Sequence, residues 1–209
     1  MTLVAAMSLD GKIATRTGES WLSSRDDLRD VHRLRSHTDA VMIGVRTELI
    51  DNPKLTVRYV NGRNPTRIVV DSSARTPVDS RILDDNSVIV AVSKKASARR
   101  ISDLQRAGAT VIYCGKAQVD LKLLLSLLYR RGIRRVLLEG GGTLNWSMLK
   151  EGLVDEIRVT IAPLILGGEK ARTLVEGAGN MTITNSFKLR LSRITRRSDE
   201  IILRYRVKR

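Results

Sequence analysis

The fold is decided by residues 135–144, which read RVLLEGGGTL. An apolar strand is expected at 135–138, three glycines follow Glu139, and a helix is expected over 143–150. Glycine lets the backbone approach a ligand closely, and the first amides of a helix attract anions. The stretch therefore predicts either a cradle for a pyrophosphate or a tight turn without a ligand. It is neither the G-x-G-x-x-G fingerprint nor a P-loop, so a standard Rossmann domain is disfavoured.

The same alternation of strand and helix continues on both sides of this stretch. Strands are expected at 2–7, 41–44, 67–71, 87–92, 109–113 and 154–161, and helices at 24–36, 97–107 and from Asp120 to near Gly132. Apolar residues alternate within 187–207, which predicts an antiparallel hairpin. The pattern predicts an α/β fold with a mixed, mostly parallel sheet. No repeat or convincing linker is present, so we expect a single domain over residues 1–209.

The composition excludes several classes of protein. With 209 residues, 42% of them hydrophobic and 28% charged, the chain is large enough to fold around an apolar core without a disulfide or a metal. A single cysteine, Cys114, and two histidines five positions apart, His32 and His37, predict no metal site. No apolar run reaches the roughly 18 residues of a membrane span. The N-terminus lacks the basic region of a signal peptide, so we expect the cytoplasm.

The charge is strongly positive, because 37 basic residues outnumber 22 acidic ones and give a formal net charge of +15. Such an excess attracts phosphorylated small molecules, nucleic acid or acidic lipid. A nucleic-acid-binding protein is one alternative. Only seven residues are aromatic, however, so stacking platforms for bases are scarce. Scattered surface charge without a ligand is the other interpretation.

Polar residues that follow the expected strands are candidates for the chemistry. Lys12 follows the first strand, and Glu139 lies at the carboxyl edge of another, where open α/β sheets bind ligands. Each is equally consistent with a solvated surface charge. Thr47 and Asp51, four residues apart, are able to line one face of a short helix and to bind a ribose or an amide, although Asp51 also suits a turn before a proline.

The remaining candidates suit the two ends of a phosphorylated ligand. The run Asp71-Ser72-Ser73 offers hydroxyls and amides to the adenosine side of a nucleotide, and the nearby Arg75 suits a 2′-phosphate. Arg35 and Arg58 are able to form a bidentate phosphate clamp. Trp21, in a loop beside Ser20, either stacks on a ring or packs in the core.

Taken in order along the chain, these motifs resemble the riboflavin-biosynthesis reductase family, and most closely its stand-alone archaeal members. The matching segments are 5–14 (AAMSLDGKIA), 44–58 (GVRTELIDNPKLTVR), 68–72 (IVVDS), 138–146 (LEGGGTLNW), 152–156 (GLVDE) and 161–168 (IAPLILGG). Bacterial members carry an additional zinc deaminase domain, which one cysteine could not supply here. The resemblance therefore implies a chain that reduces and does not deaminate.

The resemblance implies a dihydrofolate-reductase-like fold, a homodimer, and NADPH as hydride donor, with NADH left open. It implies reduction of the ribosylamino group of 2,5-diamino-6-ribosylamino-4(3H)-pyrimidinone 5′-phosphate to ribitylamino. Lys12 and Glu139 would then be catalytic. The residues implied to hold the cofactor are Thr47, Asp51, Asp71, Ser72, Ser73, Gly140, Gly141, Gly142 and Thr143, and those implied to hold the substrate are Ser20, Arg35 and Arg58.

A pterin reductase is the enzymatic alternative that the implied fold suggests. It would need an acid on the first long helix that faces the pterin ring. Asp26, Asp27 and Asp30 are the candidates for such an acid.

Overall fold

The computed structural model describes residues 1–85 and 87–208. The chain divides into two compact units, which are described separately below. The first unit comprises Met1–Val31 and Leu138–Arg209, and the second unit comprises His32–Leu137. That residues 1–209 act as one reductase domain stays a prediction.

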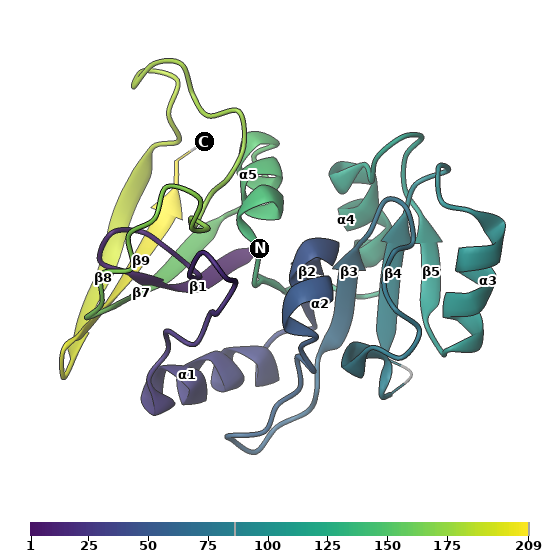
Figure 1. Ribbon diagram of the computed structural model, residues 1–209, viewed down its shortest axis with the longest axis horizontal. Coiled ribbons are helices and arrows are strands. Elements are labelled where there is room, and N and C mark those ends of the chain that lie inside the picture. The colour runs from purple at the N-terminus through teal and green to yellow at the C-terminus, as the bar shows by residue number, and fades with distance from the viewer. Residues whose placement is uncertain (86, 209) are drawn as a thin grey trace. The chain divides into compact units, whose positions relative to one another are not determined.

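The second unit is built on strands that lie side by side in one sheet (Figure 1). They are β2 (Ala40–Gly44), β3 (Thr66–Val70), β4 (Val88–Val92), β5 (Thr110–Tyr113) and β6 (Val136–Leu138), in the spatial order β5-β4-β3-β2-β6. The pairs β2–β3, β3–β4 and β4–β5 are all parallel. Their carboxyl ends therefore share one edge of the sheet, where Gly44, Val70 and Ala91 are in register.

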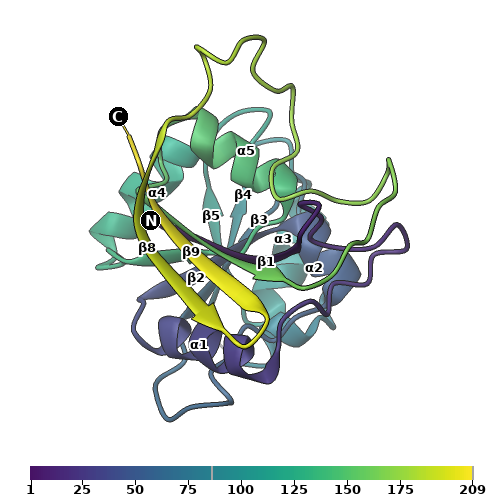
Figure 2. The same cartoon turned by 90° about the vertical axis from the view of Figure 1, so that its left-hand side faces the viewer.

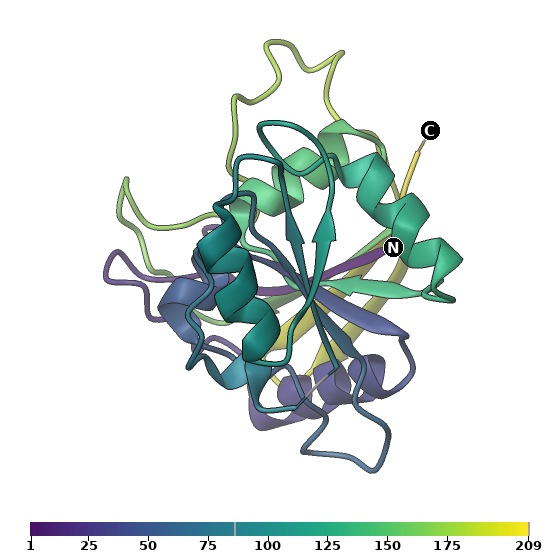
Figure 3. The same ribbon diagram turned by 90° about the vertical axis from the view of Figure 1, so that its right-hand side faces the viewer.

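The helices of the second unit are α2 (Val45–Asp51), α3 (Ala98–Arg106) and α4 (Leu121–Arg130), with a short 3₁₀ turn at Arg81–Leu83. Helices α3 and α4 lie on opposite sides of β4 and β5 (Figure 3). Both begin at a capping side chain: Ser97 accepts the Arg100 N–H, and Asp120 accepts the Leu123 N–H. The buried core under α3 includes Val90, Ile101 and Leu104.

The first unit carries β1 (Thr2–Ser8), β7 (Glu156–Ala162), β8 (Leu189–Arg197) and β9 (Glu200–Val207) in the order β1-β7-β9-β8. Strands β1 and β7 are parallel, whereas β9 pairs antiparallel with both β7 and β8. Helix α1 (Arg25–Ser36) begins on one side of these strands, and α5 (Gly142–Lys150) lies on the other (Figure 2).

A buried ion pair fixes the start of α1 to β7. Asp27 Oδ1 accepts hydrogen bonds from Arg158 Nη2 at 2.9 Å and from Thr160 Oγ1 at 2.7 Å. Both members of the pair are almost completely buried. Ser24 caps the helix, since its Oγ accepts the Asp27 N–H, and Ser24 is held in turn by Glu200 of β9. Asp27, one of the three candidate acids of a pterin site, is therefore occupied by an arginine.

The expected helices and strands are present, with boundaries that shift by one or two residues. The α/β fold with a mixed, mostly parallel sheet and a C-terminal antiparallel hairpin is thus confirmed. The hairpin turns at Ser198, whose φ is +49°. The short helix α2 contains the predicted pair Thr47 and Asp51. Within residues 1–85 and 87–208, no helix has both the length and the apolar character that crossing a bilayer requires.

Candidate functional site

The glycine turn lies in the first unit, between β6 and α5. Gly140 has a φ of +93°, a conformation that favours glycine, and the Gly140–Gly141 peptide is cis. Gly141 caps α5 without a side-chain hydrogen bond to the helix. The first amides of a nine-residue helix are thereby left without a side-chain cap, which suits an anionic group such as a pyrophosphate.

Gly142 is a glycine because of the chain's own packing. A Cβ at this position would lie 2.6 Å from the Thr173 carbonyl oxygen and 2.8 Å from Glu176 Cγ. The Glu176 N–H donates to the Gly142 carbonyl oxygen at 3.0 Å, and Glu176 Oε1 accepts the Thr173 N–H at 3.1 Å. The segment 172–176 therefore packs against the turn and leaves no room for a side chain.

The same segment also holds the loop that carries Lys12. Lys12 and Thr173 form an antiparallel bridge, and the Ile13 N–H donates to the Arg172 carbonyl oxygen at 2.8 Å. Segment 172–176 thus contacts both the Lys12 loop and the glycine turn. The structure therefore joins these two parts of the predicted site, within the first unit, through segment 172–176. Lys12 and Glu139 are both half-buried.

Asp10 also fixes the Lys12 loop, because it binds a second segment of the first unit, at 164–168. Its carboxylate accepts hydrogen bonds from the N–H groups of Leu166 and Gly167 and from Ser8 Oγ. These hydrogen bonds lower the pKa of Asp10 to about 2, and the bond from the Ser8 hydroxyl has the largest effect. The loop at 164–168 is thereby fixed next to the turn that leads to Lys12.

Asn145 was missed by the sequence analysis as a site residue. Its side chain is buried; Nδ2 donates to the Leu174 carbonyl oxygen at 2.8 Å and would lie 3.4 Å from a Cβ at Gly140. Its Oδ1 has no hydrogen-bond partner among the described residues. An acceptor of this kind beside the glycine turn fits an amide or hydroxyl donor of a ligand. Its place on the first turn of α5 was the available signal.

In the second unit, three consecutive loops meet at the carboxyl edge of the sheet. Ser93 Oγ donates to the carbonyl oxygens of Ser72 and Ala117, and Ser72 Oγ accepts the Val119 N–H. Asp71 is completely buried, and its Oδ2 accepts both the N–H and the hydroxyl of Thr76. Asp71 therefore shapes the loop that presents Ser72 and Ser73, and its direct contact with a cofactor stays a prediction.

Basic side chains surround these loops. Arg75 follows β3, Lys94 and Lys95 follow β4, and Lys116 follows β5, and all four are exposed. The Lys94 N–H donates to the Gly115 carbonyl oxygen, which ties the second loop to the third. The edge that presents Ser72 and Ser73 is therefore positively charged, as a phosphorylated nucleotide requires.

Helix α2 starts directly after β2 and carries Thr47, Glu48 and Asp51. Glu48 is buried, and neither of its carboxylate oxygens has a hydrogen-bond partner within residues 1–85 and 87–208. Burial raises the pKa of Glu48 to about 7, and the nearby Asp51 carboxylate acts in the same direction. The Ser80 hydroxyl opposes them only in part, since its proton is donated to the Pro77 carbonyl oxygen.

The structure brings Arg35 and Arg58 to the same residue. Arg35 Nη1 donates to the Thr56 carbonyl oxygen at 3.1 Å, and Arg58 Nη1 donates to Thr56 Oγ1 at 2.7 Å. Burial and the positive charge of Arg35 both lower the pKa of Arg58. Two guanidinium groups held close enough to repel one another form a site that favours an anion.

His32 is the second residue that the sequence analysis missed. Its Nδ1 accepts the Arg58 N–H at 2.8 Å, and its ring meets the Tyr59 ring edge-on with centroids 4.6 Å apart. The spacing of His32 and His37 predicts no metal site, and the sequence alone assigns His32 no other role. The spacing His32-x-x-Arg35 places both side chains on one face of α1, which was the available signal.

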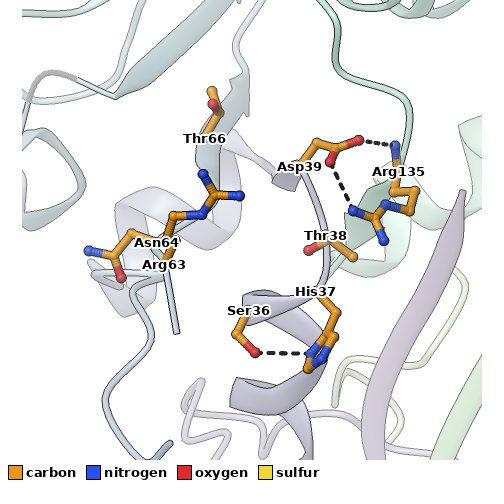
Figure 4. Close-up of a pocket in the computed structure, with 8 residues that line it drawn as sticks. All are labelled: Ser36, His37, Thr38, Asp39, Arg63, Asn64, Thr66 and Arg135. Carbon is orange, nitrogen blue, oxygen red and sulfur yellow. Dashed lines mark hydrogen bonds and ion pairs between the residues drawn. The ribbon is translucent and has the colours of Figure 1, made fainter. Parts of the chain in front are cut away.

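A polar cavity of about 240 Å³ lies at the opposite, amino-terminal ends of β2 and β3 (Figure 4). It is lined by Ser36, His37, Thr38, Asp39, Arg63, Asn64, Thr66 and Arg135. The N–H groups of Arg134 and Arg135 both donate to Asp39 and lower its pKa. None of the predicted site residues lines this cavity, so it is distinct from the candidate site.

Two predicted residues lie in an exposed loop of the first unit. Ser20 is exposed, and its carbonyl oxygen accepts the Leu22 N–H. Trp21 is 85% exposed, so core packing is the wrong alternative for this side chain. In the part of the chain that the structure describes, no group of three or more His, Cys, Asp or Glu residues is arranged to hold a metal ion.

Comparison with known proteins identifies the family. The model of the RibD C-terminal domain matches residues 1–203. The chain belongs to the RibD C-terminal domain family. It is 50% identical over 210 residues to the 2,5-diamino-6-ribosylamino-4(3H)-pyrimidinone 5′-phosphate reductase of Methanothermobacter thermautotrophicus, covering 99% of this chain and 97% of that one. The reductase of the same name from Aquifex aeolicus is 37% identical over 212 residues, covering 98% and 95%.

Solved RibD structures have the same fold. Acinetobacter baumannii RibD superposes with a TM-score of 0.85 at 28% identity, covering 99% of this chain and 57% of that one. The chain thus corresponds to a little over half of that RibD. These comparisons confirm the predicted family, the dihydrofolate-reductase-like fold class, and an oxidoreductase of riboflavin biosynthesis that uses a nicotinamide cofactor.

Proposed function

We propose that this protein reduces the ribosylamino group of 2,5-diamino-6-ribosylamino-4(3H)-pyrimidinone 5′-phosphate to a ribitylamino group, with NADPH as hydride donor. The observation that carries the proposal is the 50% identity, over nearly the whole of both chains, to a reductase of that name. We further propose that it works as a homodimer in the cytoplasm, which the family resemblance implies.

Each unit contains residues whose chemistry suits a part of a dinucleotide. In the first unit, the uncapped amides at the start of α5 suit a pyrophosphate, and the unpartnered Asn145 Oδ1 suits a donor beside the glycine turn. In the second unit, Thr47, Asp51 and Ser72–Ser73 suit the ribose and adenosine parts. The exposed Arg75, Lys94, Lys95 and Lys116 favour the additional 2′-phosphate of NADPH over NADH.

The reaction needs an open form of the sugar, because a closed ribosylamine is a poor hydride acceptor. Ring opening breaks the C1′–O4′ bond, O4′ gains a proton, and the exocyclic nitrogen forms a double bond to C1′. When bound, NADPH supplies the hydride that adds to C1′, and the nitrogen recovers its electron pair. Lys12 and Glu139 assist the proton transfers, which contributes roughly 10²–10⁴-fold to the rate.

The substrate is held through its phosphate. Arg35 and Arg58, both anchored on Thr56, bind the 5′-phosphate. A substrate held at one end presents C1′ to the cofactor in a restricted set of orientations.

The test is to follow the loss of NADPH absorbance with the aminated pyrimidine and its deaminated counterpart, side by side. We expect turnover of the aminated compound and none of dihydrofolate. The second result follows because all three candidate acids of a pterin site are paired with arginines: Asp26 with Arg29, Asp27 with Arg158 and Asp30 with Arg197. Turnover of neither pyrimidine would reject the proposed function.

A further inference from the structure

We infer that His32 is a positioning residue for the substrate phosphate, because its imidazole fixes the main chain of Arg58 in the anion site formed with Arg35. This inference rests on the proposed function for the identity of the anion. It assigns a role to a residue that would not touch the substrate.

The geometry shows which nitrogen of His32 accepts the hydrogen bond from Arg58. Nδ1 accepts the Arg58 N–H at 2.8 Å and lies 3.4 Å from the Tyr59 N–H. In a neutral imidazole the proton must then be on Nε2. Nε2 lies 3.4 Å from Arg35 Nη1, which also carries protons, so this second approach is a packing contact and not a hydrogen bond.

The surroundings hold the imidazole in place. His32 is only 2% exposed, and its ring meets the Tyr59 ring at an interplanar angle of 68°. The ring is therefore held in an orientation that directs Nδ1 toward the N–H groups of Arg58 and Tyr59. Arg58 is itself exposed, so its guanidinium is directed by its main chain and by its hydrogen bond to Thr56 Oγ1.

The two arginines reach Thr56 from different sides. Arg35 comes from α1 and binds the Thr56 carbonyl oxygen, whereas Arg58 lies two residues beyond Thr56 and binds its hydroxyl. The pair needs this arrangement because the two positive charges repel each other in the absence of an anion. His32 acts on Arg58, the exposed member of the pair, and Thr56 acts on both.

Substitution of His32 by asparagine or by glutamine tests the roles of its two ring nitrogens separately. The amide oxygen of asparagine reaches the position of Nδ1 and accepts the Arg58 N–H, whereas the longer glutamine reaches the position of Nε2. The variants are therefore His32→Asn, His32→Gln and His32→Leu. Their KM values are measured for the phosphorylated pyrimidine and for NADPH, and the Kd of inorganic phosphate is measured without turnover.

We expect His32→Leu and His32→Gln to raise the substrate KM and the phosphate Kd about tenfold, because the Arg58 N–H loses its acceptor. The KM for NADPH should stay within about twofold, and His32→Asn should restore most of the substrate affinity. An unchanged substrate KM, or an equal rise of both KM values, would overturn the inference. If His32→Leu does not fold, His32→Gln decides the question by the same criteria.

The phosphate measurement separates this inference from the proposed function. A wild-type protein that binds phosphate but does not reduce the pyrimidine would reject the function. If His32→Gln still weakened phosphate binding in that case, the role of His32 in the anion site would stand. If wild-type protein bound no phosphate, the inference would be wrong.

Discussion

The Glu176 main-chain N–H donates to the carbonyl oxygen of Gly142 at 3.0 Å, and this bond joins two segments that lie more than thirty positions apart in the sequence. It makes the shape of the glycine turn dependent on segment 172–176. The turn has no space for even one methyl group at Gly142, because the Thr173 carbonyl oxygen would lie 2.6 Å away.

Gly142→Ala should therefore displace the turn and weaken NADPH binding. Overpacking of this kind costs about 1–3 kcal/mol. Where NADPH binding has to restore the native turn, a cost of that size raises the Kd roughly 5- to 150-fold. Fluorescence titration with NADPH measures it. Gly152→Ala is the matched control, since its φ of +68° adds backbone strain in the same unit while its Cβ would meet nothing within 4 Å. Equal NADPH affinities in the two variants would contradict the explanation.

Lys12→Ala should lose roughly 10²–10⁴-fold in kcat while it still binds NADPH. The reason is that Lys12 supplies a proton near the reacting carbon in the proposed mechanism, whereas its loop is held by main-chain bonds to Arg172 and Thr173 that alanine retains. Steady-state kinetics and an NADPH titration on the same sample test both parts. Full activity would show that Lys12 has no catalytic role.

Glu48 should make the protein less stable as the pH rises. Its pKa of about 7 in the folded state lies above its unfolded value of 4.5, so the folded state binds more protons between these values. The free energy of unfolding therefore falls from about pH 4.5 to about pH 7, by up to ~3 kcal/mol, and levels off above that range. Glu48→Gln should abolish this decline and raise the Tm at pH 8. Parallel Tm profiles for the two proteins would argue against it.

Asp27→Ala should be strongly destabilising. It removes the buried carboxylate partner of Arg158, which is 2% exposed, and leaves it only the longer ion pair with the less buried Asp30 at 3.5 Å. The loss of one member of a buried pair costs about 3–5 kcal/mol, and the remaining Asp30 contact places the expected cost at the lower end of that range. Urea denaturation measures the change. Asp26→Ala is the control, because the contact of 3.6 Å between Asp26 and Arg29 is exposed and its loss should cost less than about 1 kcal/mol.

NADPH binding should weaken as the salt concentration increases, because the basic edge at Arg75, Lys94, Lys95 and Lys116 attracts its phosphates through solvent. NADH lacks the 2′-phosphate, so its affinity should depend less on salt. Kd values at low and high ionic strength test this for both cofactors. A Kd for NADPH that does not change with salt would remove the electrostatic argument.

The sequence predicted most of the fold because its signals are local. Ser97 and Asp120 cap helices at the predicted positions, and the alternation around Ser198 gave the hairpin. The candidate site was predicted only in part. Gly142 was explained by a ligand, whereas its nearest neighbours are Thr173 and Glu176. Contacts over such a separation have no periodic pattern in the sequence, and neither does the bond between Arg58 and His32.

Cys114 is completely buried at the end of β5, and burial raises the pKa of its thiol to about 11. Thiol reagents attack the thiolate, so this side chain should stay unmodified at neutral pH in the folded protein. Since the chain has no other cysteine, a cysteine introduced at an exposed position such as Thr143 would carry the sole reactive sulfur. The native sequence is thus already suited to attaching a single dye or spin label beside the glycine turn.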